Sequence, residues 1–396
     1  MIVTDDMRAT DWRALPKTLA ALSEARFFPN YMIDCPLCNP SRSTMLTGQY
    51  VHNNGVLWNE GDQNGGYPVW LRERLDRETV SFALQQAGYR TGMIGKFFGG
   101  YATIEHRPAG WDRWVGMIQH RYMGSPLDVD GTTVKYAPRD YLTDVLSGYA
   151  TEFIESTPIG QPLFMFLGSL APHNGSENGR PIPAERHMNR FRTSVVARDP
   201  AFNEADVSDK PASIAALPVM TPEVIAAMDL LERDRLRSLL AVDESIIEII
   251  DTLRRTGRLD NTYIFIASDN GFQIGQHRIA FGKAVQYQDS VRVPMLAWGP
   301  AFKKGEDRRL VANCDLAPTI ARLAKTRLPK ADGIALNTRG RRDYVLLQIM
   351  PEAQVYPTHG WGLRSAQLLY FEHESGEREY YDLRTDPWEV NNRLAA

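Results

Sequence analysis

The sequence predicts an α/β protein in which helices flank a mostly parallel central sheet, with a small antiparallel sheet at the C-terminal end. Two observations predict this fold class. The apolar runs 162–168 and 261–268 are bounded by turn residues and consist largely of β-branched, aromatic and other apolar residues, which is typical of parallel strands buried on both faces. Short strand-like segments at 360–368, 369–374 and 378–383 indicate an antiparallel sheet instead.

The chain opens with an apolar stretch that runs into two acidic residues. Met1–Thr4 has the pattern of the end of a buried strand, and Asp5 and Asp6 follow it directly. The apolar part is short for a full central strand, so we expect a first strand that has lost residues or that starts late. On its own, an Asp-Asp pair after a strand is more often a turn or a helix cap than a ligand pair.

The segment after Cys38 predicts a helix that starts directly behind this cysteine. Pro40 suits the first turn of a helix because its missing N–H needs no partner there, and no helix breaker follows before Gly48. Backbone N–H groups and the positive end of the helix dipole converge at such a start and favour a tetrahedral anion. Arg42, one turn further, points back toward Cys38 and can neutralise charge there.

Cys35 and Cys38 form a C-x-x-C pair, for which other interpretations stay open at this point. The pair could be redox-active or half of a zinc site, although the third cysteine, Cys314, has no cysteine or histidine close to it in the sequence. A buried structural cysteine is the usual case for a lone thiol, but it would not explain the Pro-Ser-Arg run that follows Cys38.

Polar residues follow the predicted strands in the middle of the chain. Residues 75–86 have helical apolar spacing, and 88–94 then predicts a strand that ends at Gly95-Lys96. The strand at 162–168 leads to His173. The strand at 261–268 delivers Asp269 and Asn270, and open α/β sheets bind ligands at such carboxyl ends.

Residues 38–48 resemble the C-x-P-S-R-x-x-x-L-T-G signature of the type I sulfatases. Ser268 to His277, Gly282-Lys283 and Tyr287 to Pro294 resemble the conserved downstream block of that family, and Tyr380 to Glu389 resembles its usual ending. The resemblance therefore covers nearly the whole chain. It implies an alkaline-phosphatase-like fold, with a catalytic sulfatase domain at 1–328 and a C-terminal α+β subdomain at 329–396.

The resemblance also implies a chemistry and a site. In the family, a formylglycine-generating enzyme oxidises the signature cysteine, here Cys38, to formylglycine, whose hydrated aldehyde attacks sulfur. The implied catalytic residues are Cys38, Arg42, Lys96, His173, Lys283 and His277. The implied metal ligands are Asp5, Asp6, residue 38, Asp269 and Asn270, and these oxygen donors suit Ca²⁺, or else Mg²⁺, rather than zinc.

One departure from the family pattern concerns the segment after Lys96. Most sulfatases have a Trp-His pair after the Gly-Lys, where this chain has Phe97-Phe98. That histidine is thought to help to release sulfate, and Phe98 cannot accept a proton. The N-acetylglucosamine-6-sulfatase branch also lacks the histidine and shares the segments 51–54, 140–144 and 259–264 with this chain. We therefore expect a carbohydrate sulfate ester, or else an aryl sulfate, as the substrate.

Composition limits the remaining possibilities. A formal net charge of −3 gives no global basic field for nucleic acid. No apolar run is long enough for a membrane span, and the first residues do not form a signal peptide, so we expect a soluble protein that is cytoplasmic or a mature secreted or periplasmic form. Two alternative functions remain. One is a phosphonate monoester or phosphodiester hydrolase on the same scaffold, against which Asn270 argues because those relatives favour histidine there. The other is a non-catalytic protein with an unmodified Cys38.

Overall fold

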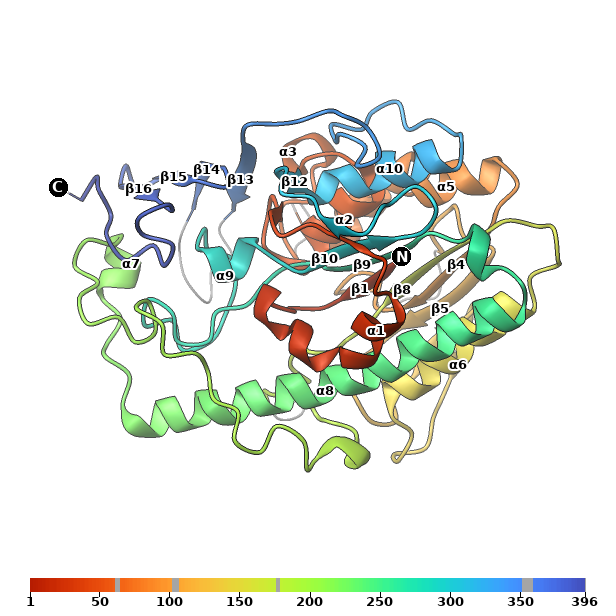
Figure 1. Cartoon of the computed structure of the whole chain (residues 1–396), viewed down its shortest axis with the longest axis horizontal. Coiled ribbons are helices and arrows are strands. Elements are labelled where there is room, and N and C mark those ends of the chain that lie inside the picture. Colours follow the sequence, from red (N-terminus) through yellow and green to blue (C-terminus); the bar gives the residue numbers. More distant parts are fainter. Residues whose placement is uncertain (61–64, 102–106, 176–178, 351–358, 396) are drawn as a thin grey trace.

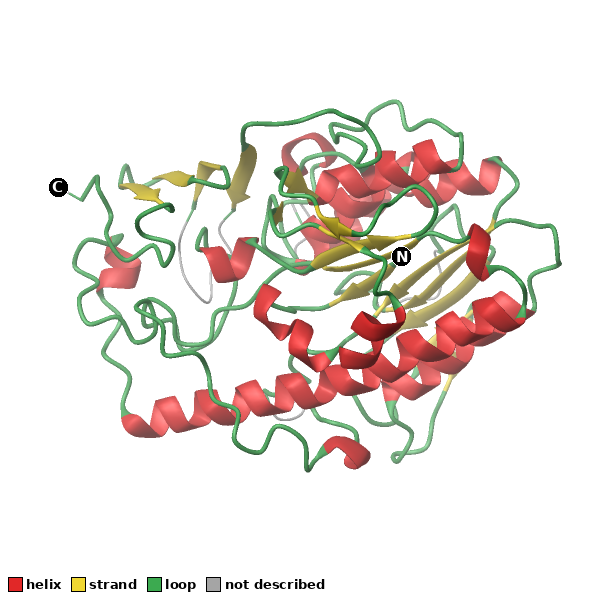
Figure 2. Ribbon diagram, in the orientation of Figure 1, coloured by secondary structure: helices red, strands yellow, loops and turns green. Residues whose placement is uncertain are grey.

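The computed structural model describes residues 1–60, 65–101, 107–175, 179–350 and 359–395. A ten-stranded, mostly parallel sheet lies in the larger part of the chain between two layers of helices, and a four-stranded antiparallel sheet lies near the C-terminus (Figures 1 and 2). The predicted α/β class and the small C-terminal sheet are therefore confirmed. The division at 328/329 stays a prediction.

The large sheet is parallel at its centre and has antiparallel pairs on either side of it, while the outermost pair at one edge is again parallel. Its order is β11 (Gly305–Glu306), β2 (Arg26–Phe27), β10 (Met295–Trp298), β9 (Ile264–Ser268), β1 (Ile2–Thr4), β8 (Leu163–Gly168), β4 (Arg90–Gly95), β5 (Arg113–Met117), β6 (Leu127–Val129) and β7 (Thr132–Val134). The strands β9, β1, β8, β4 and β5 run parallel to one another. Their carboxyl ends therefore meet at one edge.

β1 is central although it is only three residues long. Ile2 pairs with Leu167 on one side and with Ile266 on the other, and all three strand residues are buried. The prediction that the chain opens with a buried strand end is confirmed. This position matters because it places the residues after Thr4 in the middle of the carboxyl edge.

Helices cover both faces of the sheet, because neighbouring strand residues alternate between two apolar layers. Val3 and Met93 pack into one layer, and Ile2 and Ile94 pack into the other. The first layer includes α2 (Cys38–Thr47), α5 (Val80–Gln86) and α10 (Leu316–Leu323), and the second includes α6 (Leu142–Glu155) and α8 (Pro222–Arg255), beside which α1 (Pro16–Ala21) lies (Figure 1). The shorter helices are α3 (Val51–Asn54), α4 (Gly66–Arg72), α7 (Ala212–Ala215) and α9 (Gln288–Val291).

The predicted helix at 75–86 is interrupted. Leu75–Glu78 forms a 3₁₀ turn, and α5 starts after Thr79, whose backbone is extended. The Thr79 hydroxyl accepts a hydrogen bond from the Phe82 N–H over 3.1 Å and so caps the new helix. Apolar spacing alone does not reveal this cap.

The C-terminal sheet has one strand more than predicted. Its strands are β13 (Val345–Ile349), β14 (Gly360–Arg364), β15 (Leu368–His373) and β16 (Arg378–Asp382), and β13 was not predicted. The predicted strand at 360–368 ends at Arg364 because Ser365 forms a turn, in which its N–H donates to the Leu368 carbonyl. A further two-stranded sheet joins β3 (Tyr31–Met32) to β12 (Val311–Ala312).

None of the helices in the described ranges is both long and apolar enough to cross a lipid bilayer. The longest, α8, carries charged residues along much of its length.

Candidate active site

The carboxyl edge of the central sheet collects most of the predicted site residues. Asp5 and Asp6 follow β1, Asp269 and Asn270 follow β9, Lys96 follows β4, and His173 lies beyond the end of β8. Cys38 and Arg42 come from the start of α2, and Lys283 comes from the long loop after β9. The structure thus gathers side chains that the sequence separates by more than two hundred residues.

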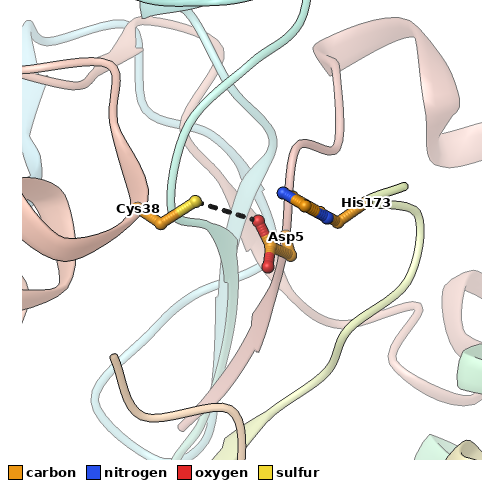
Figure 3. A group of neighbouring side chains, drawn as sticks. All are labelled: Asp5, Cys38 and His173. Atoms are coloured by element: carbon orange, nitrogen blue, oxygen red, sulfur yellow. Dashed lines mark hydrogen bonds between the residues drawn. The ribbon is translucent and has the colours of Figure 1, made fainter. Parts of the chain in front are cut away.

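Cys38 lies at the centre of this cluster. It is the first residue of α2 and is 3% exposed. Its Sγ lies 2.8 Å from Lys283 Nζ, 3.4 Å from Asp5 Oδ1 and 3.5 Å from Lys96 Nζ. Figure 3 shows the Cys38 and Asp5 side chains pointing toward each other, with His173 beside Asp5. The helix start therefore presents residue 38 to carboxylate and ammonium groups at once.

The carboxylates form a compact group of oxygen atoms. One oxygen each from Asp5, Asp6 and Asp269 lie within 4.8 Å of one another, and all three residues are buried. The Asn270 amide nitrogen donates to Asp6 Oδ1 over 2.6 Å, while the buried Asn270 Oδ1 has no hydrogen-bond partner among the described residues. An unpartnered buried oxygen next to three carboxylates fits a hard cation such as Ca²⁺ or Mg²⁺.

The cationic groups pair with these carboxylates. Arg42 Nε donates to Asp269 Oδ2 over 2.8 Å, Lys283 Nζ lies 2.6 Å from Asp6 Oδ1, and Lys96 forms an ion pair with Asp5. The second terminal nitrogen of Arg42 is buried and lacks a hydrogen-bond partner within the described part of the chain. The cluster therefore has a donor available for an additional anion.

The surroundings shift the pKa values of the carboxyl groups in opposite directions. Burial works to raise the pKa of Asp5, yet the Lys96 ammonium, followed by His173 and Lys283, holds that pKa well below its usual range. Burial and then the Asp5 carboxylate raise the pKa of Asp269 to about 6.

The thiol of Cys38 is not activated by this arrangement. Burial, followed by the Asp5 carboxylate, raises the pKa of Cys38 to about 12 despite the two lysines nearby. A thiol with this pKa is protonated at neutral pH and is a poor nucleophile.

His173 lies at the more open side of the cluster, with its side chain 23% exposed. Its Nε2 is 3.9 Å from Asp6 Oδ2, and its Nδ1 lies 2.7 Å from the Asn174 carbonyl oxygen. Because a carbonyl only accepts hydrogen bonds, Nδ1 carries the proton and Nε2 faces the cluster.

His277 does not join this cluster. Its Nδ1 lies 2.6 Å from Glu204 Oε2, and its ring packs on Tyr287 with the ring centroids 4.0 Å apart. These contacts share no residue with the cluster around Cys38. The role predicted for His277 stays a prediction that these contacts do not support.

Two further residues at the site were missed by the sequence analysis. Asn39 is fully buried, and its side-chain amide joins the loop at Asn59 to the loop at Gly99 through hydrogen bonds of 2.6 to 3.0 Å. His120 follows β5, and its ring lies edge-on to that of His173 with the centroids 5.8 Å apart. The apolar run 114–117 before His120 is the signal that could have indicated a further strand end.

The fold and this cluster define an α/β protein whose strand ends surround a buried helix start with acidic and basic side chains. A family model for sulfatases matches residues 1–326. The chain therefore belongs to the sulfatase family, whose members hydrolyse sulfuric esters.

Individual relatives agree with this assignment. The chain is 30% identical to an arylsulfatase of Volvox carteri, over 99% of this chain and 70% of that protein. It is 31% identical to the human N-acetylglucosamine-6-sulfatase, over 85% of this chain and 63% of that protein. Parts of both relatives thus lie outside the match.

A solved structure shares the fold. It is of a protein in complex with its substrate D-glucosamine-2-N,6-O-disulfate, and it superposes with a TM-score of 0.81 at 24% identity, covering 99% of this chain and 92% of the other. The likeness extends over the C-terminal sheet as well as the central one.

Proposed function

We propose that this protein hydrolyses a sulfate ester of a carbohydrate, with a formylglycine derived from Cys38 as nucleophile and a divalent cation held by Asp5, Asp6, Asp269 and Asn270. The observation that carries the proposal is the position of Cys38. Residue 38 stands at a helix start, between the carboxylates on one side and the ammonium groups of Lys96 and Lys283 on the other. This arrangement suits a nucleophile that attacks an anionic tetrahedral ester.

The state of the thiol supports an oxygen nucleophile in its place. Because its pKa is raised, the Cys38 thiol stays protonated, and the surroundings disfavour attack by a thiolate. When hydrated, formylglycine supplies a hydroxyl group at the same carbon atom. Asp5 Oδ1, at 3.4 Å from the present Sγ, is placed to accept a proton from such a hydroxyl.

The charged side chains then have distinct tasks. Arg42, Lys96 and Lys283 bind the sulfate oxygens and stabilise the negative charge that develops on them. His173 lies at the open side, where its Nε2, when it is protonated as well, can donate that proton to the oxygen that leaves with the alcohol. A hard cation on the carboxylates would supply Lewis-acid chemistry.

The substrate class rests on the relatives. One is an N-acetylglucosamine-6-sulfatase, and the solved structure with the same fold holds a 6-O-sulfated glucosamine. We therefore propose a 6-O-sulfated glucosamine unit as the preferred substrate, with aryl sulfates as poorer ones.

The test combines mass spectrometry with a substrate panel. The chain is co-expressed with a formylglycine-generating enzyme, and the peptide that contains residue 38 is expected to lose about 18 Da relative to cysteine, or almost nothing when the aldehyde is hydrated. Glucosamine 6-sulfate, 4-nitrophenyl sulfate and a phosphonate monoester are then compared. We expect the highest kcat/KM for the sugar sulfate.

Cys38→Ala and Cys35→Ala form a matched pair for this test. Cys38→Ala should lower turnover by about 10⁴-fold or more because the nucleophile is lost, whereas Cys35→Ala should stay active. An inactive Cys35 variant beside an active Cys38 variant would overturn the assignment. Turnover of the phosphonate alone would overturn the proposed reaction.

A further inference from the structure

The side chain of Phe98 belongs to a cluster of aromatic side chains. Phe98 is 2% exposed, and its ring packs against Trp70 and Phe97 with centroid distances of 4.7 and 4.4 Å. The side chain at position 98 therefore belongs to the apolar layer between the sheet and α2.

His120 occupies the space next to this segment. Its Cε1 lies 3.9 Å from the point where a Cβ would stand on Gly99, the residue after Phe98. Its ring also lies edge-on to His173, at the same carboxyl edge. Because β5 pairs with β4 in parallel, with Gly116 opposite Gly95, the loop after β5 reaches the same edge as Lys96.

The loop that carries His120 is anchored to the site. The Tyr122 hydroxyl donates to the His173 carbonyl over 2.6 Å, and Tyr122 is 1% exposed. Within the loop, the Arg121 N–H and the Ser125 hydroxyl both donate to the Gln119 carbonyl, each over 2.9 Å. These contacts fix the position of His120 relative to His173.

The imidazole of His120 makes no hydrogen bond to any residue that the structure describes, although it is partly buried. Burial, followed by the charges of Lys96 and His173, lowers the pKa of His120 to about 3. At neutral pH the ring is thus uncharged, and one ring nitrogen has a lone pair that can accept a proton.

We propose that His120 is the base that releases sulfate from residue 38, in place of the histidine that is absent at position 98. The inference rests on the proposed function. After the alcohol has left, the carbon atom of residue 38 carries one hydroxyl and one sulfate group. His120 takes the hydroxyl proton, the O–H electrons form the C=O bond, and the C–O bond to sulfate breaks with its electron pair on the departing sulfate. The aldehyde returns, and the proton passes from His120 to solvent.

The test follows a single turnover of His120→Ala with 4-nitrophenyl sulfate. We expect a first burst of nitrophenolate close to one equivalent, followed by steady turnover about 10²-fold or more below the unsubstituted enzyme. The peptide with residue 38 should gain about 80 Da, the mass of SO₃, relative to hydrated formylglycine, or about 98 Da relative to the aldehyde, because the covalent species accumulates. Gln119→Ala, an exposed neighbour in the same loop, is the matched control and should show neither effect, and thermal unfolding confirms that both variants fold.

Three other results would contradict either the role of His120 or the proposed function. Steady turnover of His120→Ala within threefold of the unsubstituted enzyme overturns the role of His120. A folded variant that shows neither the burst nor the added mass also overturns this role, because His120 would then act before the alcohol leaves. If the unsubstituted enzyme releases no alcohol from any sulfate ester and Cys38 is unmodified, the proposed function itself fails.

Discussion

At the residue scale, the side chains around Cys38 compensate one another's charge in pairs. Asp5 pairs with Lys96, Asp6 with Lys283 and Asp269 with Arg42. Such compensation is required because an unpaired buried charge costs several kcal/mol. A divalent cation on the carboxylates would compete with the lysines for them, and under the proposed function a sulfate oxygen would then replace the carboxylate as the partner of each ammonium group.

Asn270 provides a residue-scale test of the cation site. Asn270→Ala should weaken Ca²⁺ binding by about tenfold or more, because it removes the unpartnered oxygen that faces the carboxylates. Calorimetric titration of the metal-free protein with Ca²⁺ measures this directly. Asn261→Ala, an exposed substitution shortly before the same strand, is the control and should bind normally. Equal affinity in both variants would remove Asn270 from the ligand set.

At the scale of secondary structure elements, the site depends on where strands and helices end. Lys96 and Asp269 each follow the last residue of a parallel strand, and Cys38 is the first residue of α2. The dipole and free N–H groups of α2 act only at its start, so a shift of one turn would remove residue 38 from them.

The capping of α5 provides a test at this scale. Thr79→Ala should lower the free energy of unfolding by about 1 kcal/mol, because the Phe82 N–H loses its acceptor. Denaturant unfolding measures the change, and Thr79→Ser should restore most of the stability because serine keeps the hydroxyl. Catalytic parameters should stay unchanged, since the Thr79 hydroxyl bonds to Asp76, Ser81 and Phe82, none of which belongs to the cluster around Cys38. Equal stability of the Ala and Ser variants would show that the hydroxyl does not cap α5.

At the scale of the whole molecule, the C-terminal sheet and the larger part share one core. Phe371 and Tyr381 of the C-terminal sheet pack with Met32, Tyr287 and Val291 in a single apolar cluster. The buried Glu379 carboxylate accepts hydrogen bonds from the Tyr287 hydroxyl over 3.0 Å and from the Tyr381 hydroxyl over 2.6 Å. One carboxylate thus joins the loop after Lys283 to the C-terminal sheet.

Loss of this carboxylate should loosen the connection. Glu379→Ala is expected to cost about 3 kcal/mol of stability, because buried donors on Tyr287, Tyr381 and Gln286 lose their acceptor. Equilibrium unfolding and limited proteolysis of the C-terminal region measure the effect. Glu372→Ala, an exposed position on β15, serves as the control. Similar stability of the two variants would show that the apolar cluster alone joins the parts.

Much of the site could be predicted from the sequence because its residues lie next to recognisable strand or helix ends. Asp269 directly follows an apolar run, and Cys38 stands before a proline-bearing helix start, so local patterns reveal them. Arg42 could be predicted as well, because it lies on the same helix one turn after Cys38. The predicted α/β class follows equally from the apolar runs, whose composition reflects burial on both faces.

The tertiary structure alone decided which of these ends meet. The central position of β1, the pairing of Arg42 with Asp269 and the strand β13 all depend on contacts between segments far apart in the sequence. His120 and Phe98 show the same limit: the parallel pairing of β4 and β5 brings the loop with His120 to the site, and the tertiary packing joins Phe98 to the rings of Trp70 and Phe97. Local sequence specifies where an element ends, whereas the order of strands in a sheet is set by packing across the whole chain, and this order determines which side chains become neighbours.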